Sequence, residues 1–203
     1  VFYLDHLQQR GLNLSTVVRH LHFNLPVGPF FFMELAALRA LRLMWGKIIH
    51  AFGGSDKDRQ IFINARTSRY FFTRRDPAVN ILRFTTEAFS AVAGGVDTLQ
   101  INPFRASTGS SEGKTDDFPR RIARNIQLIL RDECHLDRLI DPGGGSVYLE
   151  TLTTELSRLI LGKVQEIDRS GGILENLRAG MIQKEIEEVR NRLIFPAMSL
   201  KSA

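Results

Sequence analysis

Residues 117–153 read DFPRRIARNIQLILRDECHLDRLIDPGGGSVYLETLT, and they join two helical patterns through one glycine-rich loop. Asp117 can accept hydrogen bonds from the free amides at a helix start, and Pro119 suits the first turn of a helix. Apolar residues then recur at the spacing of one helix face, namely Ile122, Ile126 and Ile129. The first half of the stretch is therefore predicted to be an amphipathic helix.

The loop DPGGGS, residues 141–146, separates this helix from the next one. Its glycines can take backbone conformations that are closed to other residues, and Ser146 can cap the following helix. That helix has an apolar face made of Leu149, Leu152, Leu156, Ile160, Val164 and Ile167, and it is ended by Gly171 and Gly172. Taken by itself, the loop can also be no more than a structural connector.

Strand and helix patterns alternate upstream of this stretch, which is typical of α/β proteins with parallel strands. After an opening helix, strands are predicted at residues 20–28, 60–68 and 98–102, with a helix at 30–52 after the first. The helix after the second strand has Asp76 as its cap, Pro77 in its first position and Gly94 at its end. A loop rich in Ser, Gly and Lys follows the third strand at 105–116, and a charged helix is predicted at 181–194.

One face of each predicted strand carries polar side chains, although both faces of a helix-covered parallel sheet are normally apolar. These polar residues alternate along the strands: His20, His22, Asn24, Asn64, Arg66, Gln100 and Asn102. Buried polar groups need hydrogen-bond partners or water. The pattern indicates either a polar lumen, enclosed by the strands, that admits a ligand, or an internal hydrogen-bond network without a ligand. The candidate substrate-binding residues, which would line the lumen, are His20, His22, Asn64, Arg66 and Gln100.

The composition is that of an ordinary globular protein, with 203 residues and 43% hydrophobic content. No run of residues approaches the length of a membrane span, and the first residues lack a basic leader, so the cytoplasm or an organelle matrix is expected. The formal charge of +5 comes from Lys and Arg residues interleaved with acids, which predicts solvated faces and neither a nucleic-acid nor a membrane partner. The tightest basic cluster, Arg66, Arg69, Arg74 and Arg75, can meet phosphate, CoA or a partner, or form a plain exposed loop.

Cys134 is the single cysteine of the chain, which excludes an internal disulfide and a multi-cysteine metal site. It falls on the apolar stripe of the helix that begins at Asp117, so it is predicted to be a core residue and not a nucleophile. The sequence indicates no catalytic residue and no metal site.

Four blocks of this chain, in this order, resemble the methylmalonyl-CoA mutase family. They are FFMELAALRALRLMW (31–45), ARTSRYFFTRRDPAVNILRFTTEAFSAVAGGVDTL (65–99), RIARNIQLILRDEC followed by DPGGGSVYLETLT (121–153), and GGILENLRAG (171–180). The resemblance implies the C-terminal part of a (β/α)8 TIM barrel, with about three parallel strands and their helices, in residues 1–140. It implies post-barrel helices and a linker in residues 141–203. A partial barrel has unpaired strand edges, so missing barrel segments or another chain must complete it.

The strands depart from the family's pattern on the side that faces the lumen. The run His20, Leu21, His22 stands where Arg-Leu-Ser is expected, and residues 64–69, NARTSR, stand where His-Cys-Gln-Thr-Ser-Gly is expected. His22 and Arg66 thereby add bulk and charge to a space that must admit a thin pantetheine arm. A filled barrel is the expected result, as in the non-catalytic small subunit of heterodimeric bacterial mutases, which this chain resembles.

The resemblance also implies a cofactor, because the family's enzymes use adenosylcobalamin to interconvert methylmalonyl-CoA and succinyl-CoA. The family's cobalt-ligating motif, Asp-x-His-x-x-Gly, does not occur in the chain. Gln100 stands where a histidine is usual, and Arg105 and Ala106 replace an acidic pair that would meet the cofactor's ribose. Adenosylcobalamin is therefore expected to be bound by a domain or subunit absent from this chain.

The resulting hypothesis is a component of an adenosylcobalamin-dependent acyl-CoA mutase. This chain would be a non-catalytic, partner-stabilising subunit or fragment that pairs with the catalytic subunit and is inactive alone. Two alternatives stay open. One is a fragment of a catalytic acyl-CoA mutase with divergent substrate specificity, and the other is a CoA-binding or chaperone-like interaction module.

Overall fold

The computed structural model describes residues 1–105 and 117–199, with side chains described through residue 192. Its elements, in chain order, are α1 (Phe2–Gln9), α2 (Leu14–Arg19), β1 (His22–Val27), α3 (Phe31–Ala51), the 3-10 turn η1 (Asp56–Arg59), β2 (Phe62–Thr67), α4 (Val79–Ala93), β3 (Thr98–Gln100), α5 (Asp117–Leu128), the π-helical turn η2 (Ile129–Glu133), the 3-10 turn η3 (Leu136–Arg138), α6 (Val147–Arg169), α7 (Gly172–Arg178) and α8 (Met181–Ser199). Most of the predicted loop at 105–116, including Ala106, lies outside the described residues.

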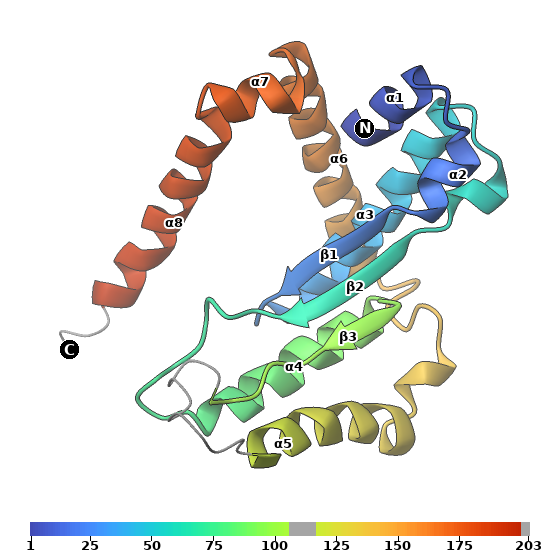
Figure 1. Cartoon of the computed structure of the whole chain (residues 1–203). Coiled ribbons are helices and arrows are strands. Elements are labelled where there is room, and N and C mark those ends of the chain that lie inside the picture. Colours follow the sequence, from blue (N-terminus) through green and yellow to red (C-terminus); the bar gives the residue numbers. More distant parts are fainter. Residues whose placement is uncertain (106–116, 200–203) are drawn as a thin grey trace.

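The three strands form one parallel sheet in the order β1-β2-β3. Figure 1 shows α3 and α4 behind one face of this sheet, while the opposite face is left open by the described residues. Parallel strands joined by helices on one side are the repeating unit of a (β/α)8 barrel, and the helices beyond α5 are additional to it. The predicted fold class, a part of such a barrel followed by extra helices, is confirmed.

Two apolar clusters hold the helices on the covered face of the sheet. In the first cluster, Trp45 of α3 packs edge-on against Phe23 of β1, with 5.0 Å between the ring centroids, and Ile63 of β2 is fully buried beneath them. In the second cluster, Phe84 of α4 lies with Ile126 of α5. The strand residues on this face are apolar apart from the buried Thr67, and the other polar residues of the strands lie on the opposite face.

The first two helices are separate, where one opening helix was predicted. Gly11 lies between α1 and α2 with a φ of +85°, a conformation that residues with a side chain rarely adopt. His20 is not part of the first strand, as predicted, because it is the C-cap residue of α2 and its Nδ1 lies 2.8 Å from the carbonyl oxygen of Thr16. β1 therefore begins at His22.

The helix after β2 begins later than the sequence pattern predicts. α4 starts at Val79, with Ala78 as its N-cap residue. The Asp76 carboxylate accepts a hydrogen bond from the Ala78 amide in the turn before the helix, so Asp76 and Pro77 belong to that turn. The predicted end at Gly94 is confirmed.

The helix after the glycine-rich loop is confirmed, but its cap differs from the prediction. Ser146 is the N-cap residue of α6 and makes no side-chain capping bond. The Glu150 carboxylate instead accepts a hydrogen bond from the Gly145 amide at 3.1 Å. α6 packs along α3 and joins the post-barrel helices to the barrel part. α7, which the sequence pattern does not predict as a helix, lies between α6 and the predicted charged helix, α8.

The prediction that Cys134 is a core residue is wrong, because its side chain is exposed. α5 widens into the π-helical turn η2, which rotates the following residues away from the apolar stripe, and Cys134 is the residue that ends this turn. His135 then adopts a left-handed conformation with a φ of 52°. The chain leaves the helix at this point instead of continuing the stripe.

Cys134 is expected to react with an alkylating reagent in the folded protein. Because the thiol is exposed, iodoacetamide should label it in the folded protein within about tenfold of the rate measured in urea. Peptide mass spectrometry measures the labelling at this residue. Protection of 100-fold or more in the folded protein, on the order expected for a core thiol, would contradict the exposed position.

Candidate functional site

The open face of the sheet carries four of the five residues that the sequence predicts for a site: His22, Asn64, Arg66 and Gln100. The strand register places them in rows that run across the sheet. His22 lies opposite Phe62, and their rings meet edge to face with 4.8 Å between the centroids. The fifth predicted residue, His20, lies outside the sheet at the end of α2.

The middle row is a hydrogen-bonded chain across all three strands. The Asn64 amide nitrogen donates to Oδ1 of Asn24 at 2.8 Å, and the Thr98 hydroxyl donates to Oδ1 of Asn64 at 2.7 Å. The register sets Asn24 opposite Asn64 and Asn64 opposite Thr98. Asn64 therefore uses both ends of its amide on neighbouring strands, which favours the internal-network interpretation for this row.

The row nearest the carboxyl ends of the strands contains Pro26, Arg66 and Gln100. Arg66 and Gln100 are exposed, and neither makes a hydrogen bond or ion pair with the part of the chain that the structure describes. In an α/β barrel, the carboxyl ends of the strands and the loops after them form the active face. Arg66 thus places an unpaired positive charge at the edge where a ligand would enter or leave.

Two glutamates, Glu34, which is half-buried, and Glu87, which is buried, lie at the carboxyl ends of β1 and β2. The Gly28 amide, directly after β1, donates to Oε1 of Glu34 from α3 at 2.9 Å. The Ser68 amide, directly after β2, donates to Oε2 of Glu87 from α4 at 3.0 Å. Each βα unit therefore seals its own strand exit with a glutamate from its own helix.

Glu87 has the more unusual environment of the two acids. Its side chain is 1% exposed, and its second carboxyl oxygen, Oε1, has no hydrogen-bond partner in the described part of the chain. Burial raises the pKa of Glu87 to about 7, the Ser68 amide opposes this rise, and the charge of Glu34 adds to it. Burial also raises the pKa of Glu34, against the hydrogen bond from Gly28.

Two buried asparagines support the same edge. Asn102 donates from its side chain to the Thr67 carbonyl oxygen at 2.7 Å, and its backbone amide donates to the Thr67 hydroxyl at 2.9 Å. Asn80 of α4 is fully buried and donates to the carbonyl oxygens of Thr73 and Phe104. These bonds connect the segment after β2 to the segment after β3, and they fix both segments to the start of α4.

The sequence interpretation missed Glu34, Glu87 and Asn80. A signal exists for the acids, because each is a lone carboxylate inside an apolar helical run: Glu34 in FFMELAAL and Glu87 in FTTEAFSAVA. Such a residue is either exposed to solvent or buried with a structural or functional role. The pattern alone does not separate the two, since Glu87 can only be recognised as buried once α4 is placed against the sheet.

The segment between β2 and α4 carries the basic cluster predicted from the sequence. Arg69, Arg74 and Arg75 are exposed and form no hydrogen bond or ion pair within the described residues, which matches the interpretation as an exposed loop. Tyr70 and Phe71 of the same segment pack edge to face at 5.1 Å, and Phe71 also contacts Phe30. Aromatic packing thus anchors the segment while its charges face outward.

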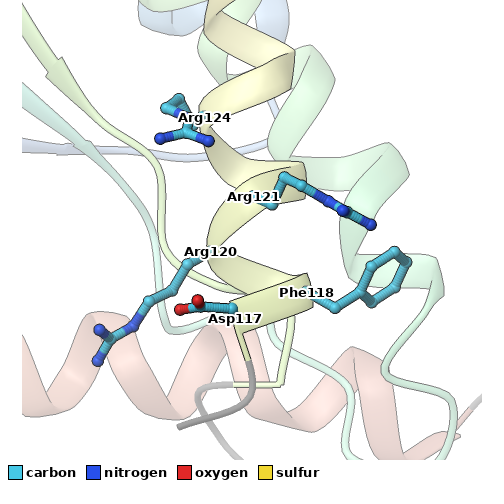
Figure 2. Close-up of a pocket in the computed structure, with 5 residues that line it drawn as sticks. All are labelled: Asp117, Phe118, Arg120, Arg121 and Arg124. Atoms are coloured by element: carbon cyan, nitrogen blue, oxygen red, sulfur yellow. The ribbon is translucent and has the colours of Figure 1, made fainter.

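A hollow lies on α5, away from the sheet's open face. It has a volume of about 420 Å³ and is lined by Asp117, Phe118, Arg120, Arg121 and Arg124. Figure 2 shows Arg120 and Arg121 pointing away from each other, with Arg121 directed toward Phe118. The guanidinium group of Arg121 lies 5.5 Å from the Phe118 ring. These arginines do not converge on one point, so the hollow does not form a cradle for an anion.

No group of three metal-ligating side chains occurs within residues 1–105 and 117–192. No described helix is long and apolar enough to cross a membrane. The candidate site is the polar face of the sheet, with Glu34 and Glu87 at the carboxyl ends of its first two strands.

Comparison with known proteins identifies similar sequences over nearly the whole chain. The sequence model of the family described as methylmalonyl-CoA mutase matches residues 1–195. A probable methylmalonyl-CoA mutase small subunit of Mycobacterium tuberculosis (strain ATCC 25618 / H37Rv) is 41% identical over 176 residues, which cover 86% of this chain and 28% of that protein. The small subunit of Porphyromonas gingivalis (strain ATCC BAA-308 / W83) is 37% identical over 185 residues, covering 90% and 29%.

A large subunit is similar to nearly the same degree. The methylmalonyl-CoA mutase large subunit of Propionibacterium freudenreichii subsp. shermanii is 37% identical over 183 residues, which cover 90% of this chain and 25% of that protein. The chain thus spans less than a third of the length of each of these relatives. Identity by itself does not separate small from large subunits.

Proposed function

Since the chain belongs to the methylmalonyl-CoA mutase family, we propose that it supplies the closing part of the barrel in an adenosylcobalamin-dependent acyl-CoA mutase. Within that assembly its role is non-catalytic and partner-stabilising. The compartment proposed for it is the cytoplasm or an organelle matrix.

The observation that carries this proposal is the state of the open sheet face. The Asn24, Asn64 and Thr98 side chains bond to one another, and the rings of His22 and Phe62 meet in the row at the amino-terminal end of the strands. A face built to hold a substrate keeps convergent polar groups available to it. Here the middle of the face is satisfied internally and the amino-terminal end is covered by rings, which supports a lumen without a passage for an acyl thioester.

The unpaired edge strands of the sheet favour a partner that completes the barrel. Among the described residues, β1 pairs only with β2, and β3 pairs only with β2. Unpaired edge strands offer rows of amides and carbonyls to another strand, and a barrel removes them by closing. The proposed occupants are the missing barrel segments or the catalytic mutase subunit.

The described residues do not fit the cobalt of the cofactor. His20 uses Nδ1 on the Thr16 carbonyl, His50 uses Nδ1 on Arg59, and His22 packs on Phe62. His6 lies against the ring of Phe2. A metal-ligating histidine has one free nitrogen and a carboxylate or carbonyl on the other; His20 has such a carbonyl partner, but its exposed ring lies at the end of α2 outside the sheet, and the family's Asp-x-His-x-x-Gly motif does not surround it. We therefore propose that a domain or subunit outside these residues binds adenosylcobalamin, which supplies the radical chemistry of the family.

Purification from the native source tests the partner. The full-length protein is expected to travel with a catalytic mutase subunit, which mass spectrometry identifies. It is also expected to show no isomerisation of methylmalonyl-CoA when supplied with adenosylcobalamin but no partner. Turnover by the protein alone would contradict the non-catalytic role and favour the divergent catalytic mutase.

Calorimetry with CoA and methylmalonyl-CoA tests the closed lumen. The full-length protein without its partner should bind either ligand with a Kd weaker than about 1 mM, if the ring pair and Arg66 fill the passage as proposed. The double variant His22→Ser and Arg66→Gln removes bulk and charge from that face and should bind at least about tenfold more tightly. Exposed Arg158→Gln is the matched control. Micromolar binding by the unchanged protein would show that the lumen is open.

A further inference from the structure

Glu87 combines three properties that a carboxyl group rarely has together. It is 1% exposed, it accepts one hydrogen bond from the Ser68 amide, and its Oε1 has no hydrogen-bond partner among residues 1–105 and 117–192. An unsatisfied buried charge costs far more than an unsatisfied neutral hydroxyl. With a proton on Oε1, the group keeps the bond from Ser68 on its carbonyl oxygen Oε2 and carries no charge.

Two charged groups act on Glu87 from the elements packed around it. Glu34 of α3 disfavours a second negative charge, and Arg83 of α4 favours one. Arg83 does not form an ion pair with Glu87, because its Nη1 donates to Oδ1 of Asn80 at 3.3 Å. Within the described residues, nothing therefore neutralises an ionised Glu87 directly.

We propose that Glu87 is a proton-binding site that controls the order of residues 68–78, the segment that carries the exposed arginines. The link is direct, because the amide that Glu87 holds belongs to Ser68, the first residue of this segment. The same amide also lies 2.8 Å from the Val27 carbonyl oxygen, which ties the segment to β1. This proposal does not rest on the mutase role.

Loss of the proton to solvent leaves a buried carboxylate with one free oxygen. Water satisfies that oxygen only if the segment over the β2 exit moves aside, so ionisation favours local opening. The folded-state pKa of about 7 lies above the ordinary value of 4.5, so the stabilising effect of the neutral form is complete below about pH 4.5. It is lost as the pH rises through about 7.

Hydrogen exchange of the full-length protein tests the proposal. After correction for intrinsic exchange, the opening equilibrium of residues 68–78 should rise about tenfold between pH 6 and pH 8. In the variant Glu87→Gln the opening equilibrium should not change over this range. The matched control Glu155→Gln, which removes an exposed carboxylate paired with Arg158, should keep the unchanged protein's profile.

If Glu87→Gln does not fold, a second variant still tests the proposal. Glu34→Gln removes the neighbouring negative charge, so the midpoint of the transition should move to lower pH. Opening that is independent of pH in the unchanged protein would overturn the proposal. The proposal would also be overturned if Glu87→Gln kept the pH dependence of the unchanged protein, or if the midpoint in Glu34→Gln did not move.

Discussion

Replacing Asn80 with alanine is expected to lower the free energy of unfolding by about 3 kcal/mol. The side chain is fully buried, donates to the carbonyl oxygens of Thr73 and Phe104 at 3.0 and 3.1 Å, and accepts from the Thr73 amide at 3.0 Å. Alanine leaves all three backbone groups without these partners. Urea denaturation followed by circular dichroism measures the change.

The matched control is Asn191→Ala on the exposed surface of α8. It should change the free energy of unfolding by no more than about 0.5 kcal/mol, since alanine suits an exposed helix position. An equal effect of the two substitutions would mean that the bonds of Asn80 do not hold the segments after β2 and β3.

Replacing Arg39 with methionine is expected to cost about 2 kcal/mol. Arg39 of α3 has a side chain that is 14% exposed, and it donates to Asp141 at 2.9 Å, to Glu150 at 2.7 Å and to Thr153 at 3.0 Å. Methionine keeps the apolar stem but leaves two carboxylates together without a cation. The cost stays below that of a fully buried pair, because both acids remain partly hydrated.

The loss should be local as well as global. Hydrogen exchange in the first turns of α6 should accelerate, because Arg39 ties this helix and the glycine-rich loop to α3. Arg158→Met is the control, since Arg158 pairs with Glu155 on the exposed side of the same helix and should cost no more than about 0.5 kcal/mol. Slower or unchanged exchange in α6 with Arg39→Met would show that the ion pairs do not hold the helix.

Much of the fold could be predicted because its signals are local. The alternation in HFNLPV and FINART marks β1 and β2, and the apolar spacing of Leu149, Leu152 and Leu156 marks α6. The ends of helices were harder to predict. The Asp76 side chain satisfies the Ala78 amide in a turn, so the pattern read as a helix cap belongs to the turn before α4. The π-helical turn at 129–133 likewise breaks a stripe that continues in the sequence.

The candidate site could be predicted only in part, and the limit is physical. The open-face residues His22, Asn64, Arg66 and Gln100 follow from the period of a strand. His20 does not, because the preceding helix extends to it and its ring bonds to Thr16. Glu34, Glu87 and Asn80 become site residues through contacts between elements far apart in the sequence. The burial of Glu87 and Asn80 and the partial burial of Glu34 are properties of the assembled layers and have no local pattern.

The two carboxylate seals bear on how this chain can diverge. The first amide after β1 and the first amide after β2 are each held by a glutamate from the helix of the same unit. Strand placement therefore does not depend on the length of the connection between that amide and its helix. Those connections are already very different, residues 29–30 in one unit and 69–78 in the other. The register of the sheet therefore does not require a connection of one fixed length, so recognition loops of different lengths can be joined at this rim while the strands stay in place.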